Sequence, residues 1–322
     1  MNSINHYREE FLAHLKTSIA VKEPQNLYEP IDYILQLGGK RLRPVLTLIA
    51  ADLFGGDYRK ALPAAAAVEV FHNFSLVHDD IMDNASLRRG KATVHQKWNS
   101  NIAILSGDAM LICAYRLLES YPPDTFAALA KLFSKTALEV CEGQQWDMDF
   151  ETQAQVSIPQ YLQMIRYKTA VLVGAALQMG AIIAGTSIEN QRLIYDFGVT
   201  IGLAFQLQDD YLDTFGDEDF GKKIGGDILE NKKTILYLKA LALADEAQRN
   251  TLIAQYTTSE ESDAKITIVT QLFRQIGAAE AVRDEITRTT DEALNLLESI
   301  TISDENRAYL KQFALELMNR KV

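Results

Sequence analysis

The sequence predicts an all-α fold, a single-domain bundle of about ten or more helices around a central cavity. Apolar residues recur with the period of a helix almost everywhere along the 322 residues, and no segment is a convincing strand. Glycine, proline and short polar clusters separate the periodic stretches. Because no Pro- or Ser-rich linker, low-complexity segment or short repeat divides the chain, we expect one domain over residues 1–322.

The expected helices lie between these glycine, proline and polar segments. A first helix ends at Gly38-Gly39, and a second runs from about Pro44 to Leu53. A long helix covers about residues 61–83, and others cover about residues 101–120, 124–146, 158–184 and 189–215. A polar loop at residues 216–227 follows, after which helices resume to the C-terminus. The longest apolar run, residues 170–184, contains Gln178 and is too short for a membrane span, so it predicts a buried helix.

Composition limits the function classes. A hydrophobic fraction of 48% and a charged fraction of 23% allow a large buried core. The net charge of −11 argues against a nucleic-acid or anionic-membrane partner, although clustered cations can still form a local anion site. Cys113 and Cys141 lie in apolar helical patterns, which predicts buried free thiols in a reducing compartment. With no signal-peptide pattern at the N-terminus, we expect a cytoplasmic protein without a transmembrane segment.

One acidic pattern occurs twice, as Asp79-Asp80-Ile81-Met82-Asp83 and as Asp209-Asp210-Tyr211-Leu212-Asp213. On a helix the first and fifth residues lie one turn apart on one face, so each copy presents two carboxylates to a common point. Both copies end largely apolar helices, where carboxylates need partners. Two facing pairs would hold hard divalent ions, and Mg²⁺ keeps coordination positions open for phosphates. The patterns predict a metal site for a diphosphate, whereas a solvated acidic face is the alternative for either copy alone.

Basic residues stand where a diphosphate would need them. Lys40 and Arg43 lie at a Gly turn that precedes a helix, where free backbone N–H groups also favour anions. Arg88 and Arg89 follow the first acidic motif, and because adjacent arginines diverge, each can bind a different phosphate group. Two lysine pairs, Lys222-Lys223 and Lys232-Lys233, would close over a bound diphosphate as a lid. Solvated basic turns and loops remain the alternative for these residues.

Together these motifs resemble one family, the trans-isoprenyl diphosphate synthases, or polyprenyl synthetases. Its members join isopentenyl diphosphate head-to-tail to an allylic diphosphate such as dimethylallyl, geranyl or farnesyl diphosphate. The resemblance runs from about residue 27 to residue 240, through GGKRLRP (38–44), HDDIMDNASLRRGKATVH (78–95), GQ (143–144), KTA (168–170), FQLQDDYLD (205–213) and GKKIGGDILENKKT (221–234). This ordered set is highly specific, and it implies the isoprenoid synthase fold.

The resemblance also implies roles for single residues. Three Mg²⁺ ions, for which Mn²⁺ can substitute, would grip the allylic diphosphate and bind to Asp79, Asp80, Asp83, Asp209 and Asp213. The same diphosphate would contact Arg88, Lys168, Lys223 and Lys232. Isopentenyl diphosphate would be held by Lys40, Arg43, His72 and Arg89. His72 alone would be taken for a core histidine, but its spacing of seven from Asp79 puts both residues on one helix face.

The expected chemistry needs no protein nucleophile. Metal ions and arginine neutralise the charge on a departing diphosphate, so the allylic C–O bond can break to leave a resonance-stabilised cation. The resemblance assigns the dipoles that stabilise this cation to Thr169, Gln206 and the backbone near Lys168. The double bond of isopentenyl diphosphate then attacks, and the released diphosphate is the expected base for the proton that is lost.

Three other functions share some of these motifs. A class I terpene cyclase shares the acidic motifs but needs no second, basic diphosphate site. A head-to-head condensing enzyme is disfavoured for the same reason. A non-catalytic subunit of a heteromeric synthase would lack one acidic motif or its arginines, whereas both motifs are whole here.

Product length and assembly are the finer expectations. A growing tail should run from the first acidic motif along its helix, where Phe74 and Phe71 lie about 7.5 Å and about 12 Å before Asp79. The residue four before Asp79 is Ser75, which in the family's pattern shifts the expected product from C15 towards C20. We therefore expect farnesyl or geranylgeranyl diphosphate, with geranylgeranyl favoured. Family members are usually homodimers, so a homodimer is expected.

Overall fold

The computed structural model describes residues 1–216, 224–258 and 262–318. Two compact units make up the chain. The first unit contains Met1–Thr136 and Leu172–Tyr195, and the second contains Ala137–Val171 and Asp196–Val322. Helices α7 (Pro123–Thr152) and α10 (Ile188–Phe215) contribute residues to both units. The expected single domain over residues 1–322 stays a prediction.

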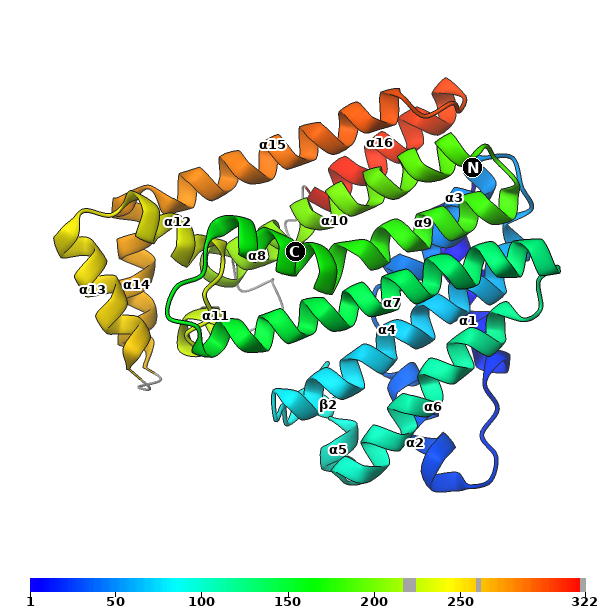
Figure 1. The fold of residues 1–322 in the computed structure, drawn as a ribbon, viewed down its shortest axis with the longest axis horizontal. Helices are drawn as coiled ribbons and strands as arrows, with labels where there is room; N and C mark the ends of the chain where they lie inside the picture. Colours follow the sequence, from blue (N-terminus) through cyan, green and yellow to red (C-terminus); the bar gives the residue numbers. More distant parts are fainter. Residues whose placement is uncertain (217–223, 259–261, 319–322) are drawn as a thin grey trace. The chain divides into compact units, whose positions relative to one another are not determined.

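Helix α4 (Leu62–Met82) is the central helix of the first unit (Figure 1). It contacts α1 (Ile4–Ser18), α2 (Gln25–Gln36), α3 (Leu42–Leu53) and α6 (Ser100–Leu118). Pro63 stands in its first turn, where a missing N–H is tolerated. The four residues Ala64–Ala67 are fully buried, because their small side chains let neighbouring helices approach. A helix buried on most sides thus ends at the first acidic motif.

A short hairpin follows α4. Strands β1 (Leu87–Arg88) and β2 (Lys91–Ala92) pair antiparallel, with Leu87 opposite Ala92 and Arg88 opposite Lys91. Arg89 and Gly90 between them both have positive φ, as a two-residue hairpin turn requires. The expectation of no strand was wrong here, because two-residue strands are too short to show alternation. The 3₁₀ turn η1 (Tyr58–Ala61) and the single turn α5 (Val94–Lys97) were likewise not expected.

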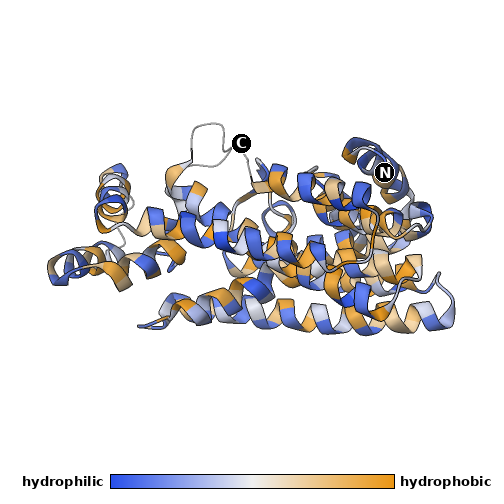
Figure 2. Ribbon diagram, turned by 90° about the horizontal axis from the view of Figure 1, so that it is seen from above, coloured by the Kyte–Doolittle hydropathy of each residue, from blue (hydrophilic) through white to orange (hydrophobic). Residues whose placement is uncertain are grey.

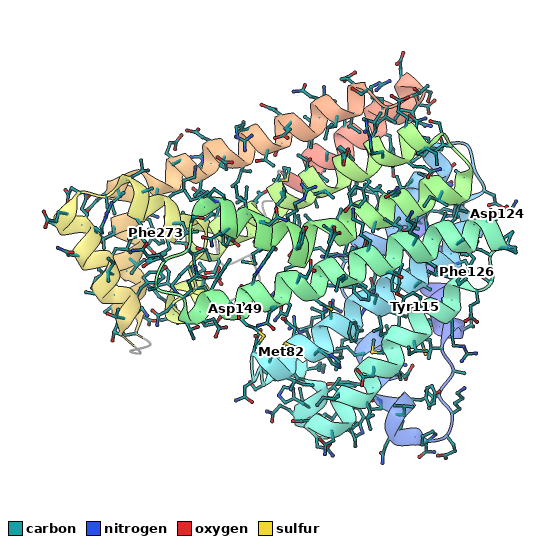
Figure 3. All side chains as sticks on the ribbon, viewed as in Figure 1. Met82, Tyr115, Asp124, Phe126, Asp149 and Phe273 are labelled. Carbon is teal, nitrogen blue, oxygen red and sulfur yellow. The ribbon has the colours of Figure 1, made fainter. Side chains whose placement is uncertain are left out.

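The second unit has its own core. It contains α8 (Ile158–Ile165), the π-helix η2 (Arg166–Ala170), α11 (Gly226–Leu229), α12 (Ile235–Leu243), α13 (Glu246–Thr257), α14 (Asp263–Ile276), α15 (Ala278–Glu298) and α16 (Asp304–Met318). Helix α12 packs on α8, α13, α14 and α15. Phe273, labelled in Figure 3, is fully buried in this core with Ile235, Leu236 and Val282. Figure 2 shows hydrophilic and hydrophobic residues alternating along the helices, as the sequence period predicts.

Most predicted helices agree with the observed ones within a few residues, although α7 runs on to Thr152, past the predicted end at residue 146. The all-α prediction is confirmed. Helix α9 (Val171–Ala184) continues from η2 and is buried, as expected for the apolar run. By length and composition alone, two described stretches could cross a membrane: Ser100–Leu118, 33% buried, and Ile158–Ala184, 61% buried. Core helices pass the same test, so this evidence is weak.

The cysteine prediction was only partly right. Both thiols are free, but Cys113 is part-buried and Cys141 is exposed. The apolar neighbours of Cys141 in sequence did not reveal that its own position on α7 faces solvent.

Candidate active site

The first acidic motif forms the C-terminal end of α4. Asp79 and Asp80 lie in the last turn, and Asp83 caps the helix through its N–H, which donates to the Asp79 carbonyl at 2.9 Å. The Asp79 side chain is 17% exposed and Asp83 is exposed, whereas Asp80 is buried. Because residues i and i+4 share a helix face, Asp79 and Asp83 are the two carboxylates that this motif offers to a ligand.

Asp80 is held by Arg88 of the hairpin. The Nε and Nη2 atoms of Arg88 donate to Asp80 Oδ1 at 2.9 and 2.5 Å, and Nη2 lies 3.7 Å from Asp79 Oδ2. Burial raises the pKa of Asp80, although Arg88 opposes this shift. Burial also opposes the charge of Arg88, but the bond to Asp80 outweighs it and raises the Arg88 pKa. Asp80 thus fixes a cation beside Asp79. The predicted metal role of Asp80 and the diphosphate role of Arg88 stay predictions.

Arg43 and Arg89 form a cationic cluster around His72, which lies two turns before Asp79 on α4. Arg43 Nη1 lies 3.4 Å from His72 Nε2, and Arg89 Nη1 donates to the Gly38 carbonyl. Burial, and next the charge of Arg43, lower the pKa of His72 well below its usual value, so the imidazole is neutral. Burial lowers the Arg89 pKa as well. Lys40 is exposed on the same loop. Three residues predicted for isopentenyl diphosphate, Arg43, His72 and Arg89, are therefore brought together within the first unit, and the fourth, Lys40, lies on the loop that Arg89 contacts.

Glycine at position 39 makes room for Arg89. A Cβ at Gly39 would lie 2.9 to 3.1 Å from the guanidinium atoms of Arg89, and the φ angle of +121° is one that other residues rarely adopt. Because Gly39 has no side chain, the GGKRLRP segment can lie against Arg89 of the hairpin turn.

The second acidic motif lies on α10 in the second unit. Asp209 is part-buried, whereas Asp210 and Asp213 are buried. Tyr161 donates its hydroxyl to Asp210, and Gln206 Nε2 donates to Asp210 Oδ1 at 3.0 Å. Burial raises the pKa of Asp210 to about 8, with Asp227 adding to the shift. Asp213 Oδ2 accepts the N–H of Asp227 at 3.0 Å.

The KTA motif lies in the π-helix η2. Lys168 Nζ donates to Asp147 Oδ2 at 2.5 Å, and the Thr169 hydroxyl donates to Gln206 Oε1 at 3.3 Å. Helix α7 approaches this segment at Gly143, where a Cβ would lie 2.2 Å from the backbone nitrogen of Lys168. The GQ motif at 143–144 thus has a steric reason, and π-turns occur often at functional sites.

Of the four lysines of the predicted lid, the structure describes only Lys232 and Lys233. Lys222 and Lys223 lie outside the described residues. Lys232 pairs with Glu230 at 2.6 Å and lies 3.9 Å from Asp227. Lys233 instead donates to the carbonyls of Phe150, Glu151 and Gln153 at 2.6, 3.1 and 2.8 Å, at the C-terminal end of α7. Such a cation satisfies terminal helix carbonyls, so Lys233 anchors the loop that carries Lys232.

The predicted chain-length residues belong to an aromatic cluster in the first unit. Phe71 and Phe74 are buried, with ring centroids 5.5 Å apart. Phe71 also packs on Phe133, at 5.2 Å, and Phe133 packs on Tyr115 of α6, at 4.7 Å. Tyr115 is labelled in Figure 3. The Ser75 hydroxyl donates to the His72 carbonyl at 2.8 Å. Sequence reasoning missed Phe133 and Tyr115, since spacing from the acidic motif carries no signal for other helices.

The donor sets fit Mg²⁺ chemically. Aspartate oxygens are the ligands that this ion prefers, and it commonly binds one or two carboxylates together with substrate phosphates. Among the described residues, no group of three or more His, Cys, Asp or Glu side chains already converges as a closed site.

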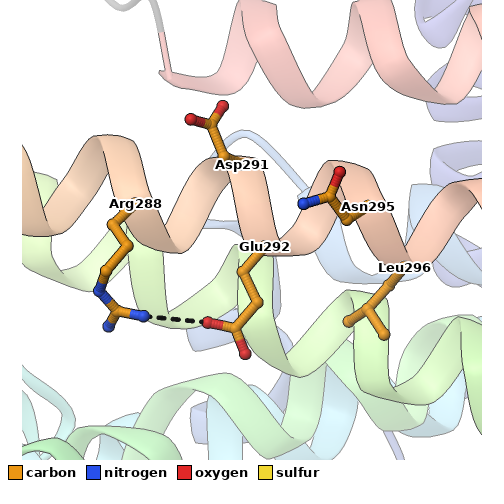
Figure 4. Close-up of a pocket in the computed structure, with 5 residues that line it drawn as sticks. All are labelled: Arg288, Asp291, Glu292, Asn295 and Leu296. Carbon is orange, nitrogen blue, oxygen red and sulfur yellow. Dashed lines mark hydrogen bonds and ion pairs between the residues drawn. The ribbon is translucent and has the colours of Figure 1, made fainter.

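A separate groove on α15 is a poor candidate. It is lined by residues of that one helix only, namely Arg288, Asp291, Glu292, Asn295 and Leu296 (Figure 4). Arg288 and Glu292 pair at 3.2 Å, as i and i+4 neighbours on exposed helices do. None of the predicted site residues lies in it.

In each unit a described helix carries two or more aspartates near its C-terminal end, and the first unit also holds an arginine cluster. The chain belongs to the polyprenyl synthetase family, whose model matches residues 24–273. It is 38% identical over 301 residues to a geranylgeranyl pyrophosphate synthase of Geoglobus acetivorans, covering 93% of this chain and 92% of the relative. It is 36% identical to a short chain isoprenyl diphosphate synthase of Methanothermobacter thermautotrophicus, covering 98% of each.

Solved structures agree with this assignment. This chain is 54% identical in sequence to a geranylgeranyl pyrophosphate synthase of known crystal structure. The two structures superpose over 100% of each chain with a TM-score of 0.96. A geranylgeranyl pyrophosphate synthetase from Pyrococcus horikoshii is 33% identical and covers 99% of this chain and 97% of its own, with a TM-score of 0.92. These relatives confirm the predicted family, fold and enzyme class, a prenyltransferase.

The first prediction concerns Gly39. We expect Gly39→Ala to raise the KM for isopentenyl diphosphate about tenfold or more, because the new Cβ displaces the Arg89 guanidinium. The KM for the allylic substrate should change less than about twofold. Steady-state kinetics with each substrate varied in turn measure both. Gly55→Ala is the matched control, because Gly55 also has positive φ, at +78°, but nothing lies within 4 Å of its Cβ position. Equal effects of the two substitutions would contradict the steric argument.

Proposed function

We propose that this protein condenses isopentenyl diphosphate head-to-tail with an allylic diphosphate and releases a short-chain trans-prenyl diphosphate, C20 or C15. The observation that carries the proposal is on α4. One helix bears a cationic cluster around His72 and, one heptad later, a pair of carboxylates beside Arg88. A synthase needs both a cationic diphosphate site and a metal-type site, whereas a terpene cyclase needs only the second. The names of the relatives support the same reaction.

The cationic cluster binds isopentenyl diphosphate in this proposal. Arg43 and Arg89 supply charge-assisted donors to its phosphate oxygens, and Lys40, which is exposed, adds another. Neutral His72 adds a donor: since Arg43 can only donate to Nε2, the imidazole proton lies on Nδ1. This site therefore needs no metal ion for binding.

The acidic motifs serve the allylic diphosphate. We assign Asp79 and Asp83 in the first unit, and Asp209 and Asp213 in the second, as Mg²⁺ ligands, with Asp80 assisting through Arg88. Three ions are expected from the family's motifs, with Mn²⁺ as a substitute. When bound, Mg²⁺ neutralises charge on the leaving diphosphate. We assign Arg88 in the first unit, and Lys168 and Lys232 in the second, as diphosphate donors; Lys223, which the family's motifs also imply, lies outside the described residues.

Neighbouring side chains stabilise the allylic cation. The Thr169 hydroxyl donates a hydrogen bond to Gln206 Oε1. Because its hydrogen points to Gln206, the lone pairs of the Thr169 oxygen can face positive charge. The backbone carbonyl near Lys168 adds a second dipole. Because every described carboxylate of the motifs has a metal or protein role, the released diphosphate is the base that takes the proton from the new chain.

The second prediction tests the reaction. Purified protein should release diphosphate from dimethylallyl diphosphate only when isopentenyl diphosphate is also present. Asp79→Ala and Asp209→Ala should each lower kcat by about a thousandfold or more, because each removes a metal ligand while the fold remains. Asp291→Ala, which removes an exposed carboxylate from the α15 groove, should leave kcat unchanged. Release without the second substrate, or activity of both motif variants within about tenfold of the parent at saturating Mg²⁺, would refute the proposal.

The third prediction concerns product length. We propose that Phe74 and Phe71 form the floor of the tail site, with geranylgeranyl diphosphate as the main product. Phe74→Ala should shift products to longer chains, because the ring nearest Asp79 is removed. Tyr28→Phe serves as the control, because Tyr28 of α2 lines a separate pocket of the same unit with Lys22 and Cys113. Chromatography of the dephosphorylated products measures the distribution, and an unchanged distribution in Phe74→Ala would place the floor elsewhere.

The fourth prediction concerns assembly. We propose a cytoplasmic homodimer. The dimer is supported by α6, which exposes Ile104, Leu105 and Ile112 at 42%, 60% and 59%. An apolar helix side of this kind is suited to pack against a second copy. Sedimentation equilibrium without detergent should give about twice 36.1 kDa, and Leu105→Glu should halve that mass. A monomeric parent, or a parent that needs detergent to stay dispersed, would overturn the proposal.

A further inference from the structure

Three polar side chains are buried together in the first unit, and no role has been assigned to them so far. Arg41 and Glu69 form an ion pair whose side chains are 2% and 1% exposed. Asn73 is fully buried one turn after Glu69 on α4. Its amide donates to the Glu69 carbonyl at 2.8 Å and to Glu69 Oε1 at 2.9 Å. Arg41 also donates through Nη2 to the Leu35 carbonyl near the end of α2.

Stability alone is a weak explanation for this group. Removing two charges from water is costly, and well-packed apolar residues often serve a fold as well as a buried ion pair does. Arg41 also has a φ angle of +51°, a left-handed conformation that is uncommon outside glycine. Conformations of this kind persist where the surroundings fix them, and they cluster at functional sites.

The location of the group points to the cationic cluster. Arg41 stands in the GGKRLRP loop between Lys40 and Arg43, and Glu69 stands three residues before His72 on α4. The ion pair therefore ties the loop that carries two of the predicted phosphate ligands to the helix that carries a third. Arg89 meets the same loop at Gly38 and Gly39.

Charge supports the same conclusion. His72 experiences the charges of Arg43, Arg89, Arg88 and Arg41, all of which lower its pKa after burial does. Arg41 also lowers the pKa of Arg89, whereas Glu69 raises it. A buried carboxylate thus offsets the mutual repulsion of the arginines. Without it, the loop would be driven away from α4.

We propose that Arg41, Glu69 and Asn73 are positioning residues that hold the isopentenyl diphosphate site in its binding geometry. They act through Lys40, Arg43 and His72 and do not touch the substrate. This inference rests on the proposed function of the cationic cluster.

Glu69→Gln is the primary test, because it removes the charge and keeps the shape. We expect the KM for isopentenyl diphosphate to rise about tenfold to a hundredfold, while kcat and the KM for the allylic substrate stay within about threefold. Titration calorimetry of isopentenyl diphosphate alone should show the same loss in affinity. A merely structural role would instead lower kcat and worsen both KM values together, in step with the melting temperature.

The double variant Arg41→Met/Glu69→Met keeps the test decisive if Glu69→Gln folds poorly. Apolar side chains remove the buried charges, so this variant should melt within a few degrees of the parent. If the group positions the loop, the KM for isopentenyl diphosphate stays raised in the folded double variant. Recovery of the parent KM would overturn the inference.

Arg89→Ala separates failure of this inference from failure of the proposed function. If Arg89→Ala raises the KM for isopentenyl diphosphate and Glu69→Gln does not, only the positioning role is wrong. If neither substitution affects that KM in an active enzyme, the assignment of the cluster itself is wrong.

Discussion

Charge separation along α4 is the constraint on which the rest of the site depends. Two diphosphates must be bound close to each other, so the protein has to offer cations to one and metal-binding carboxylates to the other without letting the two sets neutralise each other. On α4 the distance from His72 to Asp79 is seven residues, a rise of about 10.5 Å. Within the first unit, the arginine cluster contacts one end of this interval and Arg88 contacts the other. A helix buried on most sides cannot shift in register, so the interval is fixed by the packing of α4.

Both acidic motifs use their second aspartate in the same way. Asp80 and Asp210 are buried, and each is held by protein donors, Arg88 in one case and Tyr161 with Gln206 in the other. The reason lies in helix geometry, because residue i+1 is rotated by about 100° from residue i. In the first motif Asp79 and Asp83 share the more accessible face of α4, so the second aspartate turns towards the protein interior; in the second motif Asp213 is buried as well. A buried second aspartate needs a donor, and the chain supplies one that also belongs to the site: Arg88 beside Asp79, and Gln206 beside Thr169.

The sequence was sufficient for most of the helices, because helical periodicity is a local signal. The roles that its ordered motifs assign to single residues stay predictions. The sequence predicted that Arg43, His72 and Arg89 act together, and they lie together although they come from three segments of the first unit; their role stays a prediction. The sequence did not reveal interactions between residues that are far apart in the chain and belong to no common motif. Glu69 lies 28 residues from Arg41, and an isolated glutamate in an apolar helix carries no mark of its partner. Phe133 and Tyr115 were missed for the same reason. The hairpin at residues 87–92 was too short for strand alternation to show.

The central claim, that one diphosphate is bound by arginines and the other through Mg²⁺, is tested most directly by titration calorimetry with and without the metal. The ligands are isopentenyl diphosphate and an unreactive thiolo analogue of geranyl diphosphate, each titrated into the parent protein in Mg²⁺ and then in EDTA. The account predicts that the Kd of isopentenyl diphosphate changes less than about threefold, while that of the allylic analogue rises about a hundredfold or more, equivalent to about 2.7 kcal/mol. An equal dependence of both ligands on Mg²⁺ would contradict it.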